Sequence, residues 1–272
     1  MGELNLYYPQ WQGSGTQKTL YLGAAAARKG LNLKSRMEEV KLSGAKLDTE
    51  NGIQGSRALL EQMKTVKGMI EERKPGSIFT LGGGSDVSAV PVSYINKLAE
   101  GNLSVLWLSS HPDLKTPEAA EGKLQNMALR TLLENDFPEM DALYDKKLDP
   151  SQVVILGGQS ATDEEKAYIE EKGIRYIPAE NLIWNDPKSW IKDLKDHVFI
   201  CVNFDIFEPE AFPHAYRKTE HGMQIEQLSN LLKVLDEERN IAGFTLAEYG
   251  STDPDPLEKE EFKTIVATGL WI

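Results

Sequence analysis

The chain has little cysteine, little positive charge and no long apolar run. Its 272 residues include one cysteine and 30 lysines and arginines against 42 aspartates and glutamates, for a formal net charge of −12. This excess of acid argues against nucleic acid or an anionic membrane as a partner. No apolar run approaches the roughly 20 residues of a membrane-spanning helix, and residues 1–8 lack the basic-then-apolar pattern of a signal peptide.

The single cysteine, Cys201, excludes a disulfide within the chain and is typical of a protein from a reducing compartment. It lies inside an apolar run, so we expect it to be buried and unreactive. With 40% hydrophobic residues, the chain can bury a large core. We therefore expect a globular protein of the cytoplasm.

Short apolar segments alternate with amphipathic segments along the whole sequence. Strands are expected at Glu3–Tyr8, Met37–Leu42, Ser77–Leu81, Asn102–Leu108, Gln152–Leu156, Arg175–Ile177, His197–Phe204 and Ile241–Ala247. Helices are expected between them, the longest at Gly52–Arg73 and Met223–Arg239. Because no linker interrupts the alternation, it predicts a single α/β domain over residues 1–272 with a mostly parallel sheet.

The carboxyl end of the strand Asn102–Leu108 carries the first candidate site. Ser109, Ser110, His111, Pro112 and Asp113 follow it directly. In an open α/β sheet, ligands bind just beyond the carboxyl ends of the strands. His111 and Asp113 can therefore both point at one metal ion, although a hydrogen-bonded turn without a ligand would have the same sequence.

Three other strand ends carry unusual residues. Gly82–Asp86 is a glycine-rich turn that could cradle a phosphate at a helix N-terminus or only cap that helix. Asn203 and Asp205 end a very apolar strand, and Glu248 ends the last one. A buried carboxylate needs a partner, so the four strand ends together predict a metal or small-molecule site at one edge of the sheet.

In their order along the chain, these motifs resemble those of the arginase/agmatinase/formiminoglutamase (ureohydrolase) family, and Pro9–Gly13 resembles the opening of a divergent bacterial branch. The family's Gly-Gly-Asp-His turn is similar to Gly82–Ser85, and its Asp-Ala-His-x-Asp motif is similar to Ser109–Asp113. Its Asp-x-Asp-x-x-Asp-Pro motif is similar to Asn203–Pro209, and its late, substrate-holding glutamate falls on Glu248. The resemblance covers nearly the whole chain and implies a three-layer α/β/α, arginase-like fold.

The resemblance also implies a chemistry. Family enzymes hold two manganese ions with six side chains, and a hydroxide that bridges the metals attacks the guanidinium carbon of arginine or a related amidine. A metal lowers the pKa of bound water, so that hydroxide forms near neutral pH. Oxygen and imidazole ligands suit Mn²⁺.

Three of the six implied ligands are replaced by neutral side chains. Serines and an asparagine stand in place of the turn histidine and of two bridging aspartates, at Ser85, Ser109 and Asn203. The metal-ligating positions that remain are His111, Asp113 and Asp205. Two dications held close together need carboxylate charge to offset their repulsion. We therefore expect at most one manganese ion.

Two classes of function follow. In the first, the protein is catalytically impaired or inactive and binds a small molecule or a partner. In the second, it still hydrolyses C–N bonds of a linear amidine or guanidine, with a single metal on His111 and Asp205 and the Asn203 oxygen in the ligand shell. A third idea is metal-free acid–base chemistry by His111, oriented by Asp113.

In either main class, a small-molecule ligand such as an amidine or guanidine is expected. The expected catalytic residues are His111 and Glu248, and the substrate pocket is expected to contain Ser85, Ser109, Asn203 and Glu248. The resemblance also allows a homo-oligomer. On the long loop after Pro209, His214, Arg217 and His221 could line the mouth of the site, but we expect them to be exposed to solvent.

Overall fold

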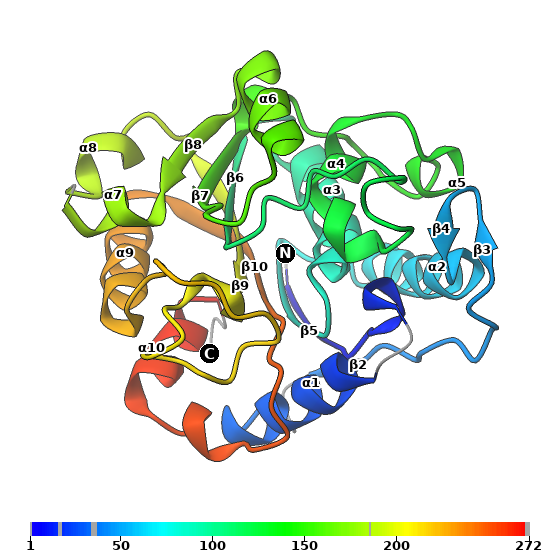
Figure 1. Ribbon diagram of the computed structural model, residues 1–272, viewed down its shortest axis with the longest axis horizontal. Helices are drawn as coiled ribbons and strands as arrows, with labels where there is room; N and C mark the ends of the chain where they lie inside the picture. Colours follow the sequence, from blue (N-terminus) through cyan, green and yellow to red (C-terminus); the bar gives the residue numbers. More distant parts are fainter. Residues whose placement is uncertain (1, 16–17, 34–36, 185, 270–272) are drawn as a thin grey trace.

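The computed structural model describes residues 2–15, 18–33, 37–184 and 186–269 (Figure 1). The strands of its central sheet are β1 (Glu3–Tyr8), β2 (Glu38–Glu39), β5 (Ser77–Gly82), β6 (Leu103–Ser109), β7 (Val153–Gly157), β8 (Arg175–Pro178), β9 (His197–Asn203) and β10 (Asn240–Ala247). Among the described residues, all pairs in this sheet are parallel, and the strand order is β2-β1-β5-β10-β9-β6-β7-β8. The predicted parallel sheet is confirmed.

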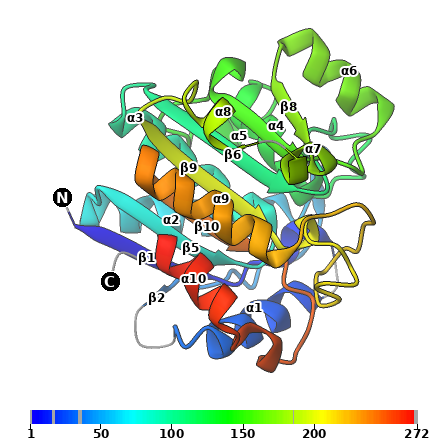
Figure 2. The same cartoon turned by 90° about the vertical axis from the view of Figure 1, so that its left-hand side faces the viewer.

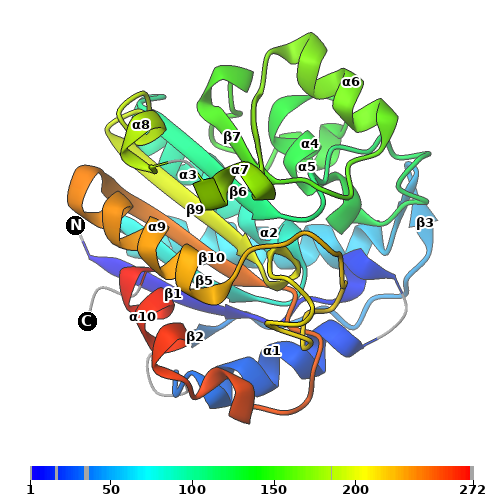
Figure 3. The ribbon, with the colours of Figure 1, turned by 60° about the vertical axis from the view of Figure 1, so that its left-hand side comes forward.

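Helices cover both faces of the sheet, as Figures 2 and 3 show, and this gives three α/β/α layers. One face carries α1 (Thr19–Gly30), α7 (Ala179–Trp184), α8 (Lys188–Ile191), α9 (Ile225–Glu238) and α10 (Glu260–Gly269). The other face carries α2 (Ser56–Arg73), α3 (Ala89–Leu98), α4 (Ala128–Leu133), α5 (Pro138–Asp141) and α6 (Asp163–Lys172). The short 3-10 helices are η1 (Gln12–Ser14), η2 (Ser85–Ser88), η3 (Leu124–Met127), η4 (Pro150–Gln152), η5 (Phe204–Ile206) and η6 (Asp255–Leu257).

A hydrophobic core lies on each face of the sheet, under one helical layer, and the central strands contribute side chains to both cores. In β6, Leu106 and Leu108 point into the core under α9, whereas Val105 and Trp107 point into the core under α2 and α3. Successive side chains of a strand alternate between faces, so a strand that is covered on both sides is apolar throughout. Cys201 lies in the second core and is buried, as predicted.

The long helix begins later than predicted. The long helix begins at Ser56 rather than at Gly52, because β3 (Thr49–Glu50) and β4 (Ile53–Gln54) pair as an antiparallel hairpin. The turn between them is Asn51-Gly52, and both residues have a positive φ. Asn-Gly is the preferred sequence of such a two-residue turn, so the signal was present.

Beyond Ala247 the sequence predicted no helix, yet α10 packs against the sheet through Phe262, Ile265 and Val266. These three residues recur at helical spacing, but charged residues precede them and conceal the pattern. Among the described residues, no helix has both the length and the apolar character that crossing a membrane requires.

Candidate functional site

Four adjacent strands end at the candidate site. The strands β5, β10, β9 and β6 are neighbours in the sheet and run in parallel, so their carboxyl ends lie at one edge. The buried polar residues at these ends are Ser85, Ser109, Asp113, Asn203, Asp205 and Glu248, each at most 3% exposed. His111 joins them with a side chain that is 22% exposed. The structure therefore places these seven strand-end residues at one edge of the sheet.

Asp205 accepts hydrogen bonds at both of its carboxylate oxygens. Its Oδ1 accepts from the Ser109 hydroxyl at 2.9 Å and from the Ser110 backbone N–H at 3.1 Å. Its Oδ2 accepts from the Ser110 hydroxyl at 2.6 Å and lies 2.9 Å from His111 Nδ1. These contacts fix the carboxylate against the turn that follows β6.

His111 is oriented by Asp205, not by Asp113 as the sequence suggested. Because an ionised carboxylate can only accept, Nδ1 carries the hydrogen and Nε2 is left as the basic nitrogen. The Ser110 hydroxyl also lies 2.6 Å from Nδ1. In a nucleophilic triad the serine and the acid contact opposite ring nitrogens, so this arrangement does not activate Ser110.

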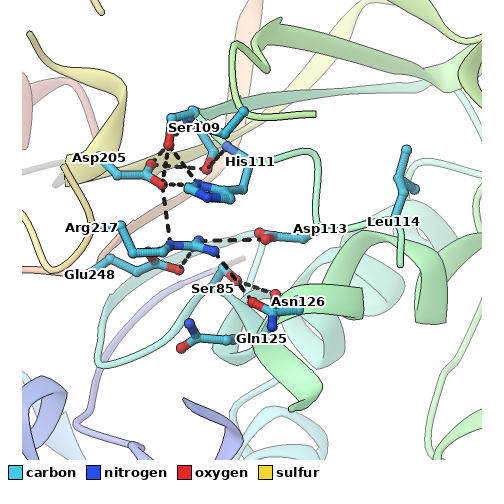
Figure 4. Close-up of polar contacts among 12 residues, drawn as sticks. Ser85, Ser109, His111, Asp113, Leu114, Gln125, Asn126, Asp205, Arg217 and Glu248 are labelled. Carbon is cyan, nitrogen blue, oxygen red and sulfur yellow. Dashed lines mark hydrogen bonds and ion pairs between the residues drawn. The ribbon is translucent and has the colours of Figure 1, made fainter. Parts of the chain in front are cut away.

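Arg217 was expected to be exposed to solvent, but its guanidinium lies inside the cluster (Figure 4). Its Nε and Nη2 donate to the two carboxylate oxygens of Glu248 at 3.1 and 2.9 Å. The same two nitrogens lie 3.4 Å from Asp205 Oδ2 and 3.5 Å from Asp113 Oδ1. Nη1 donates to Asn126 Oδ1 at 3.4 Å. The Arg217 side chain is only 17% exposed, and the three carboxylates are fully covered.

The loop that carries Arg217 is attached to the end of β10. The Tyr216 N–H donates to the Glu248 carbonyl at 2.9 Å, and the Gly250 N–H donates to the His214 carbonyl at 2.9 Å. A Cβ at position 250 would lie 2.5 Å from the Tyr216 Cα, so only glycine permits this approach. Backbone hydrogen bonds thus hold the loop against the end of β10, next to Glu248, which is the main partner of Arg217.

Aromatic packing also holds this loop in place. Phe212 stacks on Phe204 with ring centroids 5.1 Å apart, and it also contacts Tyr249. The His214 ring packs edge-on against Phe212 at 5.5 Å and is partly buried, contrary to expectation, whereas His221 is exposed as predicted. The part of the loop around Phe212 therefore packs against the hydrophobic core.

A family model described as the arginase family matches residues 21–260. The chain belongs to the arginase family. The resemblance read from the strand-end motifs is thereby confirmed.

The relatives are distant. The arginase of Bacillus caldovelox is 24% identical over 184 residues, which are 64% of this chain and 60% of that protein. The N(omega)-hydroxy-L-arginine amidinohydrolase of Streptomyces lavendulae is 28% identical over 167 residues, which are 61% of this chain and 57% of that protein. The matched segments thus span about three fifths of these relatives.

Solved structures agree over the whole fold. The arginase of Entamoeba histolytica in complex with L-ornithine superposes with a TM-score of 0.83 at 15% identity, covering 98% of this chain and 97% of that one. The formimidoylglutamase of Bacillus subtilis gives 0.73 at 16% identity, covering 98% and 84%. At these identities the likeness establishes the three-layer arginase fold.

The Ser85 and Ser109 hydroxyls both have hydrogen-bond partners. The Ser85 hydroxyl donates to the Gln125 carbonyl at 3.1 Å, and the Ser109 hydroxyl donates to Asp205. Asn203 ends β9 and is buried. Within the described residues, no group of three or more His, Cys, Asp and Glu side chains is arranged to hold a metal ion.

Asp86, one position past Ser85, binds elsewhere. Its Oδ2 accepts from the Gln10 side chain at 2.7 Å, and a Cβ at Gly13 would lie 2.5 Å from the same oxygen. The Pro9–Gly13 opening thus supplies both a donor and the space for this carboxylate. Burial raises the pKa of Asp86 to about 7, and the charge of Glu248 adds to the increase.

Burial dominates the electrostatics of the cluster, and Arg217 opposes it. Burial raises the pKa of Asp113 well above its ordinary value and that of Glu248 to about 7, while the Arg217 charge pulls both down. For Asp205, burial also raises the pKa, but Arg217, His111 and Ser110 together outweigh it and hold the pKa at about 2. Asp205 is therefore the firmly ionised member of the cluster.

Two of the acids lie on strained backbone. Asp113 has a φ of 56° and Glu248 has a φ of 69°. Left-handed backbone at residues other than glycine costs on the order of 1 to 3 kcal/mol and is concentrated at functional sites. The fold thus holds both carboxylates in place at a cost in stability.

A signal for Arg217 existed in the sequence. A site with several buried carboxylates needs a cation that balances their negative charge. The loop after β9 lies beside the site, and Arg217 is its one arginine.

Proposed function

We propose that this arginase-family protein has lost two-manganese hydrolysis, is catalytically impaired or inactive, and binds a small molecule at the carboxyl edge of its sheet. The proposal rests on the contacts of the Asp205 carboxylate. Both of its oxygens are engaged by Ser109, Ser110 and His111, and a guanidinium lies 3.4 Å away. A carboxylate so occupied is a poor ligand for a dication.

The donor set as a whole does not fit two manganese ions. Ser85, Ser109 and Asn203 offer neutral oxygens at the three substituted positions, and the Ser85 and Ser109 hydroxyls already donate to other groups. The negative charge that remains is shared with Arg217. Offsetting the repulsion of two dications requires anionic ligands that are free to bind them.

Two polar side chains of the cluster are open to solvent, where a small molecule could contact them. His111 and Arg217 are the partly exposed members of the cluster, at 22% and 17% of their side chains. The carboxylates lie behind them. Ligands proposed from the family are amidines and guanidines, and the protein is proposed to act in the cytoplasm, as a monomer or a homo-oligomer.

The test is release of urea or ammonia from a panel of guanidines and amidines, with manganese in excess. We expect no turnover by the wild-type protein, because the bridging ligands are absent. Turnover on any member of the panel that depends on manganese would contradict the proposal. The matched gain-of-function variant combines Ser85→His, Ser109→Asp and Asn203→Asp with Arg217→Ala, and it should bind manganese where the wild type does not.

The second candidate is an amidine hydrolase with one metal at His111 and Asp205. One observation favours a reduced site. Asp113 is the carboxylate that Arg217 holds least closely, because Arg217 Nη2 lies 3.5 Å from Asp113 Oδ1 but 2.9 Å from Glu248. This candidate requires turnover by the wild type and its loss in His111→Ala, so turnover that survives His111→Ala would exclude it.

A further inference from the structure

The cluster contains more buried negative charge than a fold can leave unbalanced. Asp113, Asp205 and Glu248 each have fully covered side chains. An ionised carboxylate without a partner is costly in such a position. Apart from His111, Arg217 is the partner in every ion pair that the described residues form with these three.

The guanidinium matches the shape of the cluster as well as its charge. Nε and Nη2 donate in parallel to the two oxygens of Glu248, which is the paired geometry that an arginine can form and a lysine cannot. Nη1 turns to Asn126 on η3. Donors on all three nitrogens are therefore directed at acceptors supplied by Glu248, directly after β10, and by Asn126 on η3.

The position of Arg217 is also fixed in advance. Its neighbour Tyr216 is hydrogen-bonded to the backbone of Glu248, and Gly250 permits the two segments to touch. A side chain that merely folded over an open site would not need this attachment. Loop, strand end and ion pair form one unit.

We infer that the Arg217 guanidinium is the resident cation of this site, and that it excludes a divalent cation from Asp113, Asp205 and Glu248. The inference rests on the proposed function, because it explains what replaces the family's metal charge. A guanidinium and a dication compete for the same carboxylate oxygens and repel each other at short range. Without the guanidinium, the oxygen and imidazole donors around its position would suit a hard dication such as Mn²⁺ or Mg²⁺.

Titration with Mn²⁺ tests the inference, with free Mn²⁺ followed by electron paramagnetic resonance and the thermal midpoint measured in parallel. We expect Arg217→Ala to bind one Mn²⁺ per chain and to gain thermal stability from it, while the wild type does neither. The matched control is Arg73→Ala, which removes an exposed arginine paired with Glu38 and should behave like the wild type. Adding Asp113→Asn to Arg217→Ala should weaken the Mn²⁺ affinity by about tenfold or more.

Two results would overturn the inference. One is an Arg217→Ala protein that binds no more Mn²⁺ than Arg73→Ala does. The other is a wild-type protein that binds Mn²⁺ and loses it on Asp113→Asn. Arg217→Lys keeps a cation at the site and should stay free of Mn²⁺, so tight binding by that variant would also count against exclusion by charge.

The test remains decisive if Arg217→Ala does not fold alone. Folding on addition of Mn²⁺ supports the inference directly. If the variant stays unfolded with Mn²⁺, the pair Arg217→Ala with Glu248→Gln removes one negative charge and is judged by the same two outcomes. Failure here is distinct from failure of the proposed function, because an Arg217→Ala protein that binds no Mn²⁺ would overturn the inference even if the wild type shows no amidine turnover.

Discussion

Replacing Arg217 by methionine is expected to lower the free energy of unfolding at pH 8 by about 3 to 5 kcal/mol, the usual cost of removing one partner from a buried ion pair. Methionine keeps much of the side-chain volume, so lost packing contributes little to that figure. The loss comes from Asp113, Asp205 and Glu248, which would face one another without a cation. Urea denaturation gives the measurement and avoids guanidinium as a reagent.

The loss should depend on pH, with a sign that follows from the carboxyl pKa values. Arg217 opposes the increase that burial imposes on Asp113 and Glu248, and it helps to hold the pKa of Asp205 at about 2. Without it these pKa values rise, so the folded variant keeps protons that the unfolded chain releases. Its stability then falls as the pH rises from about 4 to 8. The gap between wild type and variant should therefore be larger at pH 8 than at pH 5.

The matched control is Arg73→Met, whose ion pair with Glu38 lies at the surface. Exposed pairs contribute about 0 to 1 kcal/mol. A second control combines Arg217→Met with Glu248→Gln and should recover part of the loss, because one unpaired charge is removed. An Arg217→Met protein that loses no more than Arg73→Met, equally at pH 5 and pH 8, would show that the ion-pair cluster carries no stability.

Replacing Asp205 by alanine should be comparably severe, at about 3 to 5 kcal/mol, because it removes the acceptor of several buried donors at once. The Ser110 N–H, the Ser109 hydroxyl and His111 Nδ1 would all lose their partner. Since the folded pKa of Asp205 lies at about 2, below its unfolded value, its contribution is present above about pH 4 and disappears as the pH falls towards 2.

Denaturation of Asp205→Ala at pH 7 and at pH 3 checks both parts of that expectation. Asp196→Ala is the control, because Asp196 is exposed and accepts one side-chain hydrogen bond, from Asn102. Surface changes of this kind usually shift stability by about 0.5 kcal/mol or less. If Asp205→Ala matched that control at pH 7, the hydrogen bonds around Asp205 would be energetically unimportant.

Much of the fold followed from the sequence because parallel strands that are covered on both faces must be apolar along their length. Asn102–Leu108 and His197–Phe204 are such runs, and both became central strands. The hairpin at Thr49–Gln54 and the helix α10 were missed, since the first is too short for a periodic signal and the second begins among charged residues.

The site was half predictable. Strand ends are fixed by the sheet, so Ser109, Asp205 and Glu248 could be placed together from their position after apolar runs. Arg217 follows no strand, and its place depends on backbone contacts at Tyr216 and Gly250 that no periodic pattern records. Only the unbalanced charge of the carboxylates pointed to it.

A crystal structure of the wild-type protein grown with excess Mn²⁺ would show directly which cation holds the three carboxylates. We expect the Arg217 guanidinium between Asp113, Asp205 and Glu248, with no anomalous manganese signal at the ends of β5, β6, β9 and β10. Two manganese ions at these strand ends, with Arg217 turned away from Glu248, would contradict this expectation.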